Sequence, residues 1–379
     1  MRIGFDATAA LTQGGGIGRY TRDLLAALAE VDHVYHYRIF SARPPLQLPV
    51  RNPIPDGPRI SFRQTILSPR WLYRLWYRLR LPIPVQLFTG SIDLFHSPDF
   101  VLPPVLGGVP TILTVHDLSF VHYPETFTPA LVGYLNRVVP WSVHRASHVL
   151  ADSNATRNDL IRVYKTPAEK VTVLYSGVHE NFKPVTSDQE LARVRDKYGL
   201  GDEPYIFTVS TLQPRKNHQM LIRAYQPVAS ESTYNLIIAG GKGWLYEQML
   251  DEVERQNLTD RIRFIGFVDD DDLPALYSAA SIFVFPSLYE GFGLPVLEAM
   301  ACGTPVIASN ASSLPEVAGD AALLVDSQDE KAWTESMLRL IDDVGLRVRL
   351  VASGFRQSRR FQWQNSARQL LELYRQLLG

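Results

Sequence analysis

The chain has 379 residues, of which 46% are hydrophobic and 20% are charged. These proportions are typical of a globular protein and exclude a disordered or fibrous chain, and the length exceeds what one hydrophobic core usually supports. The single cysteine, Cys302, excludes an intramolecular disulfide and a cysteine-based metal cluster, which favours a reducing compartment. The sequence has no run of about 18 apolar residues and no signal-peptide core. It therefore predicts a cytoplasmic protein, with any membrane contact peripheral, at the inner face of the cell membrane.

The net charge of −1 is unevenly distributed along the chain. Residues 1–183 carry 19 Lys and Arg against 13 Asp and Glu, whereas the remaining residues carry 19 against 26. The difference is either chance or a sign that the first half faces an anionic partner or surface. Because the overall charge is near zero and no nucleic-acid-binding module is recognisable, we expect no nucleic-acid partner, despite the arginine-rich segment 63–80.

Short apolar strand candidates alternate with helical patterns along the chain, which is typical of βαβ units and parallel sheets. The first series comprises residues 2–7, 34–40, 93–97, 111–117 and 148–153. The second series comprises residues 205–210, 235–240, 262–268, 282–287, 305–309 and 322–326. The polar segment 177–190, which contains Pro184, predicts a linker between the two series. We therefore predict an α/β protein with domains at 1–183 and 184–360, followed by an amphipathic helix at 361–379.

Ligands of doubly wound sheets bind beyond the carboxyl ends of strands, often at the N-terminus of the next helix. The glycine-rich segment 14–18 occupies such a place after the first predicted strand. Gly15 and Gly16 either let the backbone approach a phosphate or simply form a tight turn, because the segment is not a complete dinucleotide-binding motif.

Two cations, Arg215 and Lys216, follow the predicted strand 205–210 through a short loop. Adjacent cations at a strand end can neutralise a leaving diphosphate, where negative charge builds up in the transition state. The alternative is an ordinary pair of solvated side chains.

The segment from Glu290 to Glu298 follows the apolar strand 282–287 and enters a helix. Its glycines permit a tight turn that presents backbone N–H groups, and Pro295 suits the first helical turn. Glu290 precedes the helix and Glu298 lies about one turn inside it. We therefore expect the two carboxylates to be separate and to bind different hydroxyls of one extended ligand, instead of forming an acid–base dyad.

His116 and Asp117 end the apolar strand candidate 111–117, and Tyr123 follows in a predicted loop. A histidine in such a strand is more often structural, but at the carboxyl end it can face a ligand. We therefore keep Asp117 and Tyr123 as candidates for the acceptor side.

Together, these motifs resemble the retaining glycosyltransferases of family GT4. The E-x7-E pattern of 290–298 carries the resemblance, with the segments TLQPRKN (211–217) and GGIGRY (15–20). Segments 95–104, 114–127, 151–160 and 177–184 also look like this group and occur in the same order. The resemblance thus covers most of the chain, and it extends to bacterial mannosyltransferases that build cell-surface polysaccharides.

The resemblance implies a GT-B fold, with two Rossmann-like doubly wound domains facing a central cleft. The domain 184–360 would bind the nucleotide-diphosphate sugar, and the domain 1–183, completed by the helix 361–379, would bind the acceptor. Arg215 and Lys216 would hold the diphosphate, Glu290 the donor-sugar hydroxyls and Glu298 the ribose hydroxyls.

Further contacts are implied by the same resemblance. The backbone of Phe292, Gly293 and Leu294 would face the sugar and phosphate, and Phe267 and Val268 would flank the base. In the first domain, Gly15 and Gly16 would approach the phosphate, and His116 would lie near the reacting sugar carbon.

The implied activity is transfer of a hexose, with mannose from GDP-mannose preferred, to a hydroxyl of a glycan or lipid-linked acceptor. A UDP or ADP sugar as donor, and a non-catalytic sugar-nucleotide-binding protein, are the alternatives. Retention without an evident carboxylate nucleophile suggests front-face substitution. We expect neither a cofactor nor a metal, because Arg215 and Lys216 would replace a divalent cation, and the aspartates 269–272 are better interpreted as a helix N-cap and first turn than as a metal-binding motif.

Residues 68–80 predict one helix that begins at Pro69 and ends before Pro82. Leu72, Leu75, Trp76 and Leu79 would form an apolar stripe. The arginines would form a cationic stripe, and the other aromatic residues would lie at the boundary between the two stripes. The candidates for contact with an anionic membrane are Arg70, Trp71, Arg74 and Arg78. The alternative is that the apolar stripe packs on its own domain and the arginines are solvated.

Overall fold

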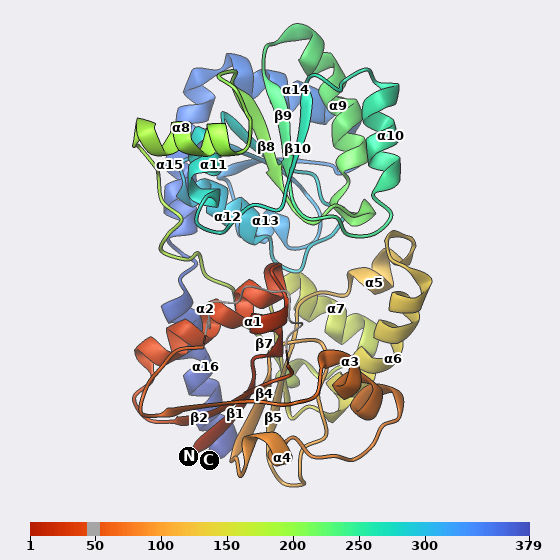
Figure 1. Ribbon diagram of the computed structural model, residues 1–379, viewed down its shortest axis with the longest axis vertical. Coiled ribbons are helices and arrows are strands. Elements are labelled where there is room, and N and C mark those ends of the chain that lie inside the picture. Colours follow the sequence, from red (N-terminus) through yellow and green to blue (C-terminus); the bar gives the residue numbers. More distant parts are fainter. Residues whose placement is uncertain (44–53) are drawn as a thin grey trace. The chain divides into compact units, whose positions relative to one another are not determined.

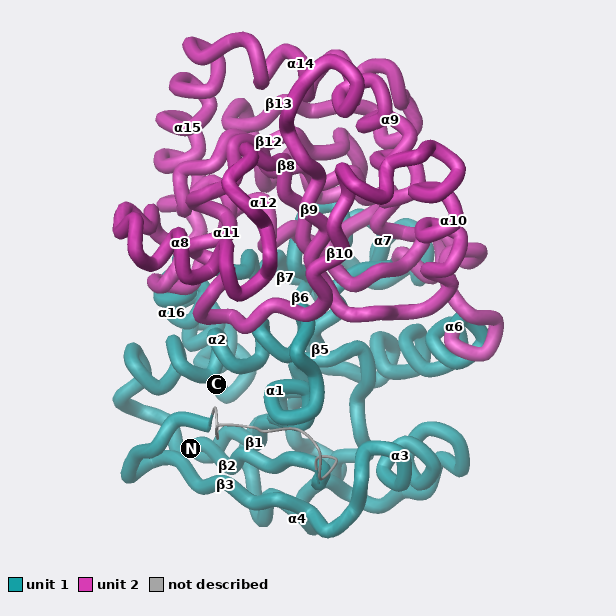
Figure 2. The backbone as a smooth tube through the Cα atoms, turned by 45° about the horizontal axis from the view of Figure 1, so that its top comes forward, with its two compact units in different colours: residues 1–118, 132–177, 362–379 teal, residues 119–131, 178–361 magenta. Residues whose placement is uncertain are grey.

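The computed structural model describes residues 1–43 and 54–379 (Figure 1). The chain forms two compact units, shown in different colours in Figure 2. Unit 1 comprises residues 1–118, 132–177 and 362–379, and unit 2 comprises residues 119–131 and 178–361. Each unit is an α/β domain with its own sheet and core.

Within its described residues, unit 1 contains a parallel sheet of seven strands in the order β3-β2-β1-β4-β5-β6-β7. The strands are β1 (Arg2–Asp6), β2 (His36–Ser41), β3 (Ile60–Gln64), β4 (Leu94–Ser97), β5 (Thr111–Val115), β6 (His148–Ala151) and β7 (Val171–Val173). The helices are α1 (Thr8–Thr12), α2 (Gly16–Val31), α3 (Pro69–Leu72), α4 (Gln86–Thr89), α6 (Pro129–Arg145), α7 (Asn154–Tyr164) and α16 (Trp363–Leu378). Our prediction missed the edge strands β3 and β7, because β3 is half-exposed and β7 has only three residues.

The C-terminal helix α16 belongs to the core of unit 1. Trp363, Leu370 and Tyr374 are buried there, and the hydroxyl of Tyr374 lies 2.8 Å from Nδ1 of His96 on β4. Gly177 packs against the start of this helix, where an added Cβ would lie 2.2 Å from the backbone nitrogen of Trp363. The predicted amphipathic helix at 361–379 is thus placed with the first series of strands.

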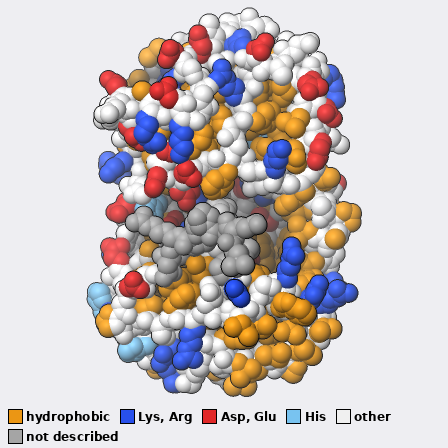
Figure 3. Space-filling model, in the orientation of Figure 1, with side chains coloured by type: hydrophobic (Ala, Val, Ile, Leu, Met, Phe, Trp, Pro, Cys, Tyr) orange, Lys and Arg blue, Asp and Glu red, His pale blue; other side chains and the backbone are white. Residues whose placement is uncertain are grey.

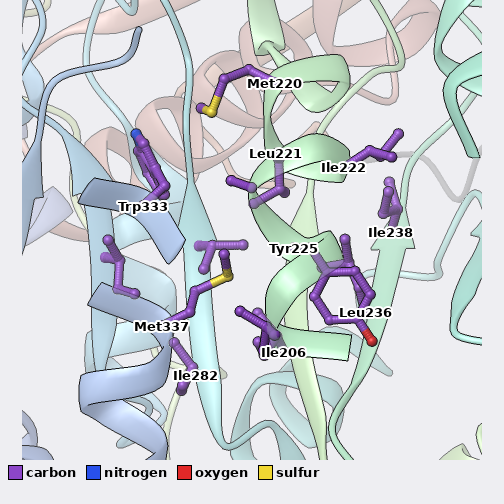
Figure 4. Packing of buried hydrophobic residues seen from close by; sticks show 14 of the residues in the cluster. Ile206, Met220, Leu221, Ile222, Tyr225, Leu236, Ile238, Ile282, Trp333 and Met337 are labelled. Atoms are coloured by element: carbon purple, nitrogen blue, oxygen red, sulfur yellow. The ribbon is translucent and has the colours of Figure 1, made fainter. Parts of the chain in front are cut away.

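Within its described residues, unit 2 contains a parallel sheet of six strands in the order β10-β9-β8-β11-β12-β13. The strands are β8 (Tyr205–Val209), β9 (Asn235–Ala239), β10 (Ile262–Gly266), β11 (Ile282–Phe285), β12 (Val306–Ser309) and β13 (Ala322–Val325). The helices are α5 (Ser119–His122), α8 (Asp188–Lys197), α9 (His218–Glu231), α10 (Glu247–Arg255), α11 (Leu273–Ala279), α12 (Leu294–Ala301), α13 (Leu314–Ala318), α14 (Glu330–Asp342) and α15 (Val344–Ser358). Figure 4 shows Leu221 of α9 on the side of Trp333 and Met337 of α14, and Tyr225 of α9 beside Leu236 of β9, in the core.

Each sheet has one place where the strand order reverses. In unit 1 the chain leaves β1 toward β2 and β3 and returns to β4 on the other side of β1, and in unit 2 β8 is flanked in the same way by β9 and β11. Loops that leave such a pair of strands diverge, and the crevice between them is the usual ligand site of doubly wound sheets. We therefore expect a ligand site of unit 1 at the loops after β1 and β4, and one of unit 2 at the loops after β8 and β11.

The division into units differs in two places from the domains that we expected at 1–183 and 184–360. The chain passes to unit 2 after Gly177, before the predicted boundary, and Ser119–Leu131 belongs to unit 2. Trp244 explains part of the second difference, because its indole donates a hydrogen bond of 2.7 Å to the carbonyl of Thr126. Such a contact joins residues more than a hundred positions apart, and a division by sequence cannot anticipate it.

Candidate active site

The loops after β8 and β11 meet at the strand-order reversal of unit 2. Pro214 opens a 3-10 turn, Pro214–Lys216, and Asn217 ends it with a φ of +59°, which asparagine tolerates better than most residues. The amide of Asn217 donates to the carbonyls of Pro286, at 3.2 Å, and Ser327, at 2.7 Å. These bonds tie the loop that carries the two cations to the loop that follows β11.

Arg215, Lys216 and Glu290 form a buried charge cluster in these loops. Nη1 of Arg215 lies 3.1 Å from Oε2 of Glu290, and Nζ of Lys216 lies 2.5 Å from Oε1. All three side chains are about nine-tenths buried. Burial by itself would raise the pKa of Glu290, but the charges of Lys216 and Arg215 outweigh it and lower the pKa to about 2. Glu290 is therefore ionised at neutral pH, and the cluster carries one net positive charge that can meet a diphosphate.

The turn after Glu290 is shaped by a glycine and two serines. Gly293 has a φ of +116°, a conformation that residues with a Cβ rarely adopt, and a Cβ there would lie 2.6 Å from the side chain of Leu314. The hydroxyl of Ser313 donates to the carbonyls of Glu290, at 3.0 Å, and Phe292, at 2.7 Å, and the N–H of Glu290 donates to Ser312. The phenyl ring of Phe292 is buried against Phe361. Leu294 begins α12, so the predicted backbone contacts all lie at the N-terminus of this helix.

Glu298 is held apart from the charge cluster. It lies on α12, is 1% exposed, and accepts a hydrogen bond of 2.9 Å from the hydroxyl of Tyr277 on α11. Glu290 and Glu298 thus have different partners.

Phe267 and Val268 follow β10 at the same edge of the sheet. Phe267 is 63% exposed, whereas Val268 is buried. Of the two residues expected to flank a base, only Phe267 exposes its side chain to the solvent.

In unit 1, His116 lies directly after β5 and is buried. Its Nδ1 lies 2.7 Å from Oδ2 of Asp152, and its Nε2 lies 3.0 Å from the carbonyl of Pro98. Burial would lower the pKa of His116, but the adjacent charge of Asp152 and the hydrogen bonds raise it to about 9. The ring is therefore an imidazolium at neutral pH that donates both N–H groups within unit 1. Asp117, the next residue, is half-buried.

Gly15 and Gly16 lie at the N-terminus of α2. Neither has a positive φ, and a Cβ at either position would meet no atom of the described residues within 4 Å. Neither a left-handed backbone nor close packing of the described residues therefore requires glycine at these two positions. The glycine that packing does require is Gly18, where a Cβ would lie 1.9 Å from the carbonyl oxygen of Gln13.

Several residues at these edges were not predicted from the sequence. Asp6 ends β1 and Asp99 follows β4, so both lie at the strand-order reversal of unit 1. Burial, with a smaller effect of the Asp99 charge, raises the pKa of Asp6 to about 6. In unit 2, Tyr289 accepts a hydrogen bond from Arg215 at its carbonyl, and its ring centroid lies 6.2 Å from that of Tyr123. A carboxylate at a strand end is visible in the sequence, whereas the place of Tyr289 is not.

The predicted helix at 68–80 is wrong in its geometry. The structure has α3 followed by a π-helical turn, Tyr73–Arg78. The wider turn moves residues out of the 3.6-residue register, so Leu72 and Trp76 are buried but Leu79 is 62% exposed. Trp71 is 53% exposed, and the guanidinium of Arg74 lies 5.1 Å from the centre of its ring. The exposed side chains therefore mix cationic and apolar groups, and Figure 3 shows such a mixture on the lower part of the face in view.

Of the aspartates 269–272, Asp272 is the N-cap residue of α11, as expected, and Asp269 and Asp272 also form salt bridges. Asp272 precedes α11 but makes no capping hydrogen bond with its side chain. Its carboxylate binds Lys197 at 2.5 Å, Arg193 at 2.6 Å and the hydroxyl of Tyr198 at 2.8 Å. These bonds lower the pKa of Asp272 to about 2, against the opposing effect of burial.

Comparison with known proteins identifies the family. Residues 14–182 match the family described as Glycosyltransferase Family 4, and residues 192–357 match Glycosyl transferases group 1. The O-antigen chain mannosyltransferase B of Escherichia coli is 35% identical over 373 residues, which cover 96% of each chain. The chain belongs to glycosyltransferase family 4.

Other relatives and solved structures agree with this assignment. The O-antigen chain mannosyltransferase RfbU of Salmonella typhimurium is 29% identical to this glycosyltransferase over 86% of each chain. Sucrose-phosphate synthase from Thermosynechococcus elongatus has a TM-score of 0.78 at 24% identity and covers 100% of this chain and 99% of its own. Anabaena HepE in complex with UDP and glucose has a TM-score of 0.75 at 22% identity and covers 99% of both chains. The expected GT-B fold of two Rossmann-like domains is confirmed.

The His116–Asp152 pair predicts how the stability of the glycosyltransferase depends on pH. Because the folded-state pKa of His116 is raised to about 9, its contribution is fully present below the unfolded pKa of about 6.5 and is lost as the pH rises through 9. Between pH 6.5 and 9.5, the free energy of unfolding should fall by about 3 kcal/mol more in the wild type than in His116→Gln. Urea denaturation at several pH values measures this difference, and equal slopes for the two proteins would contradict the assigned charge.

Proposed function

We propose that this glycosyltransferase transfers mannose from GDP-mannose, with retention, to a hydroxyl of a glycan or lipid-linked acceptor in cell-surface polysaccharide synthesis. The buried cluster of Arg215, Lys216 and Glu290 at the strand-order reversal of unit 2 carries the proposal of donor binding. The preference for mannose is supported by the mannosyltransferase relatives.

In this proposal, Arg215 and Lys216 bind the diphosphate, and Glu290 turns to the hydroxyls of the donor sugar. The diphosphate would take over the role of counterion from Glu290, so that each cation exchanges one oxygen ligand for another. Because the negative charge on the departing diphosphate grows during bond cleavage, two fixed cations stabilise the transition state more than the ground state. They would supply the neutralisation for which other enzymes use a divalent cation.

The remaining donor contacts follow from the positions of the residues. Glu298 would bind the ribose hydroxyls, the N-terminus of α12 from Phe292 to Leu294 would face the phosphate and sugar, and Phe267 with Val268 would flank the base. Front-face substitution needs no protein nucleophile, since the departing phosphate oxygen takes the acceptor proton. The protein would then act by holding donor and acceptor in the reactive geometry.

Residues of unit 1 would serve the acceptor and the reacting carbon. His116, as an imidazolium, would contribute a fixed positive charge beside Asp117, and the N-terminus of α2 at Gly15 and Gly16 would admit a phosphate. Tyr123 itself belongs to unit 2 and lies against Tyr289, so we propose for it a supporting contact to the donor site in addition to the expected place on the acceptor side.

The donor can be identified by binding and transfer. We expect GDP to raise the melting temperature more than UDP or ADP, because a ligand that binds only the folded state stabilises it, by about 2.7 kcal/mol at a hundred times its Kd. Mannose transfer from GDP-mannose should persist in excess EDTA. Faster transfer from a UDP or ADP sugar would contradict the proposed donor, and activity that EDTA removes and Mg²⁺ or Mn²⁺ restores would contradict the role of the two cations.

Substitutions in the charge cluster test the mechanism. Lys216→Ala and Glu290→Gln should each lower kcat about a hundredfold, or on the order of 3 kcal/mol of transition-state stabilisation, with the fold retained. Lys331→Ala is the matched control, since Lys331 lies on α14 and its side chain is 87% exposed. Initial rates and circular dichroism spectra are compared for all four proteins, and a wild-type rate in either cluster variant would overturn the assignment.

We also propose that unit 1 contacts the anionic inner face of the cell membrane through Arg70, Trp71, Arg74 and Arg78. Within the described residues, every helix is too short or too polar to cross a bilayer. An exposed tryptophan beside three exposed arginines matches the chemistry of a lipid headgroup layer. Such a contact would bring the protein to a lipid-linked acceptor.

Vesicle binding tests this contact. The triple variant Arg70→Ala, Arg74→Ala, Arg78→Ala should bind vesicles that contain anionic lipid at least tenfold more weakly than the wild type, because each arginine near the surface contributes about 1 kcal/mol. The control variant replaces Arg349, Arg356 and Arg359 with alanine. These arginines are exposed in unit 2, so their replacement removes the same amount of charge. Co-sedimentation at low and moderate salt measures binding. Equal binding of the wild type and the triple variant of Arg70, Arg74 and Arg78 would contradict the proposed membrane contact.

A further inference from the structure

The segment Ser119–Leu131 is part of unit 2, although the chain on both sides of it belongs to unit 1 (Figure 2). It has two aromatic anchors on unit 2. At the first, the indole of Trp244 donates to the carbonyl of Thr126, and its ring lies 5.6 Å from that of Phe127. At the second, His122 and Tyr123 pack against Tyr289.

The second anchor is a stack of aromatic rings. The rings of His122 and Tyr289 are 5.2 Å apart and inclined by 20°, and Tyr123 approaches at 6.2 Å with an inclination of 56°. Tyr289 is 7% exposed. Aromatic pairs at such distances attract each other beyond the effect of the area they bury, so this packing restricts where the ring of Tyr289 can lie.

The backbone of Tyr289 connects this aromatic stack to the charge cluster. Nη1 of Arg215 donates a hydrogen bond to the carbonyl of Tyr289 and also contacts Oε2 of Glu290, the next residue. The N–H of Leu288 in turn donates to the carbonyl of Arg215, at 2.9 Å. Nη1 of Arg215 is therefore shared between the carbonyl of Tyr289 and the carboxylate of Glu290.

We propose that Tyr289 is a positioning residue for the diphosphate site, and that His122 holds its ring so that its carbonyl orients Arg215. This inference rests on the proposed function, because it assigns to Arg215 the binding of a diphosphate. When Glu290 turns to the donor sugar, the carbonyl of Tyr289 is the contact that keeps the guanidinium in place. A displacement of a catalytic group by about 1 Å can cost a hundredfold in rate, so the restraint matters for transfer as well as for binding.

Pyrophosphate is the probe, because it contains the diphosphate and does not depend on the identity of the base. Tyr289→Ala should weaken pyrophosphate binding about tenfold in isothermal titration calorimetry and lower kcat at least tenfold. Tyr289→Phe keeps the ring and should restore both. His122→Ala leaves Tyr289 intact and should reproduce part of the loss, which keeps the test valid if Tyr289→Ala folds poorly.

A double-mutant cycle separates positioning from a general structural effect. If Tyr289 acts through Arg215, then Tyr289→Ala should change pyrophosphate affinity less than twofold when Arg215 is already alanine. The inference is overturned if Tyr289→Ala binds pyrophosphate like the wild type, or if its loss persists in full beside Arg215→Ala. Failure of the wild type itself to bind pyrophosphate would overturn the proposed diphosphate site, and with it this inference.

Discussion

One interaction, the buried contact of Arg215 and Lys216 with Glu290, organises the edge of the unit 2 sheet where the strand order reverses. Removing three charges from water costs free energy that their mutual attraction only partly returns, so apolar residues in the same place would serve stability at least as well. In the proposed function, the cluster is a binding site. Its cations lie away from bulk water, so that their attraction for a diphosphate is strong, and Glu290 neutralises part of their charge until the donor binds. The loops that carry them are tied by Asn217 and by the carbonyl of Tyr289.

Unit 1 places a different set of charges at the corresponding edge of its sheet. The imidazolium of His116 is balanced by Asp152, and Asp6 and Asp99 lie at the strand-order reversal. The two units thus share one construction, a parallel sheet whose order reverses once, and differ in the sign of the groups at the reversal.

Most of the strands could be predicted because their signal is local. Every strand of unit 2 falls on a predicted apolar run. The central strands β8, β9, β11 and β12 are buried, and a parallel strand buried on both faces has a continuous hydrophobic sequence. The half-exposed edge strand β3 and the short β7 lack that signal. The helix predicted at 68–80 failed for another reason: a π-helical turn displaces the apolar stripe, and a period of 3.6 residues cannot anticipate it.

The sequence by itself determined the α/β class, the family, and the candidate residues that follow strands, among them Arg215, Lys216, Glu290 and His116. Each depends on neighbours within a few residues, so spacing and residue type reveal it. Only the tertiary structure decided that Glu290 pairs with Arg215 and Lys216, more than seventy residues away, and that Asp152 pairs with His116. It also decided that Ser119–Leu131 belongs to unit 2 and that Tyr289 holds Arg215. These contacts depend on which strands become neighbours in a sheet, and strand order is set by packing of the whole chain, which no local pattern encodes.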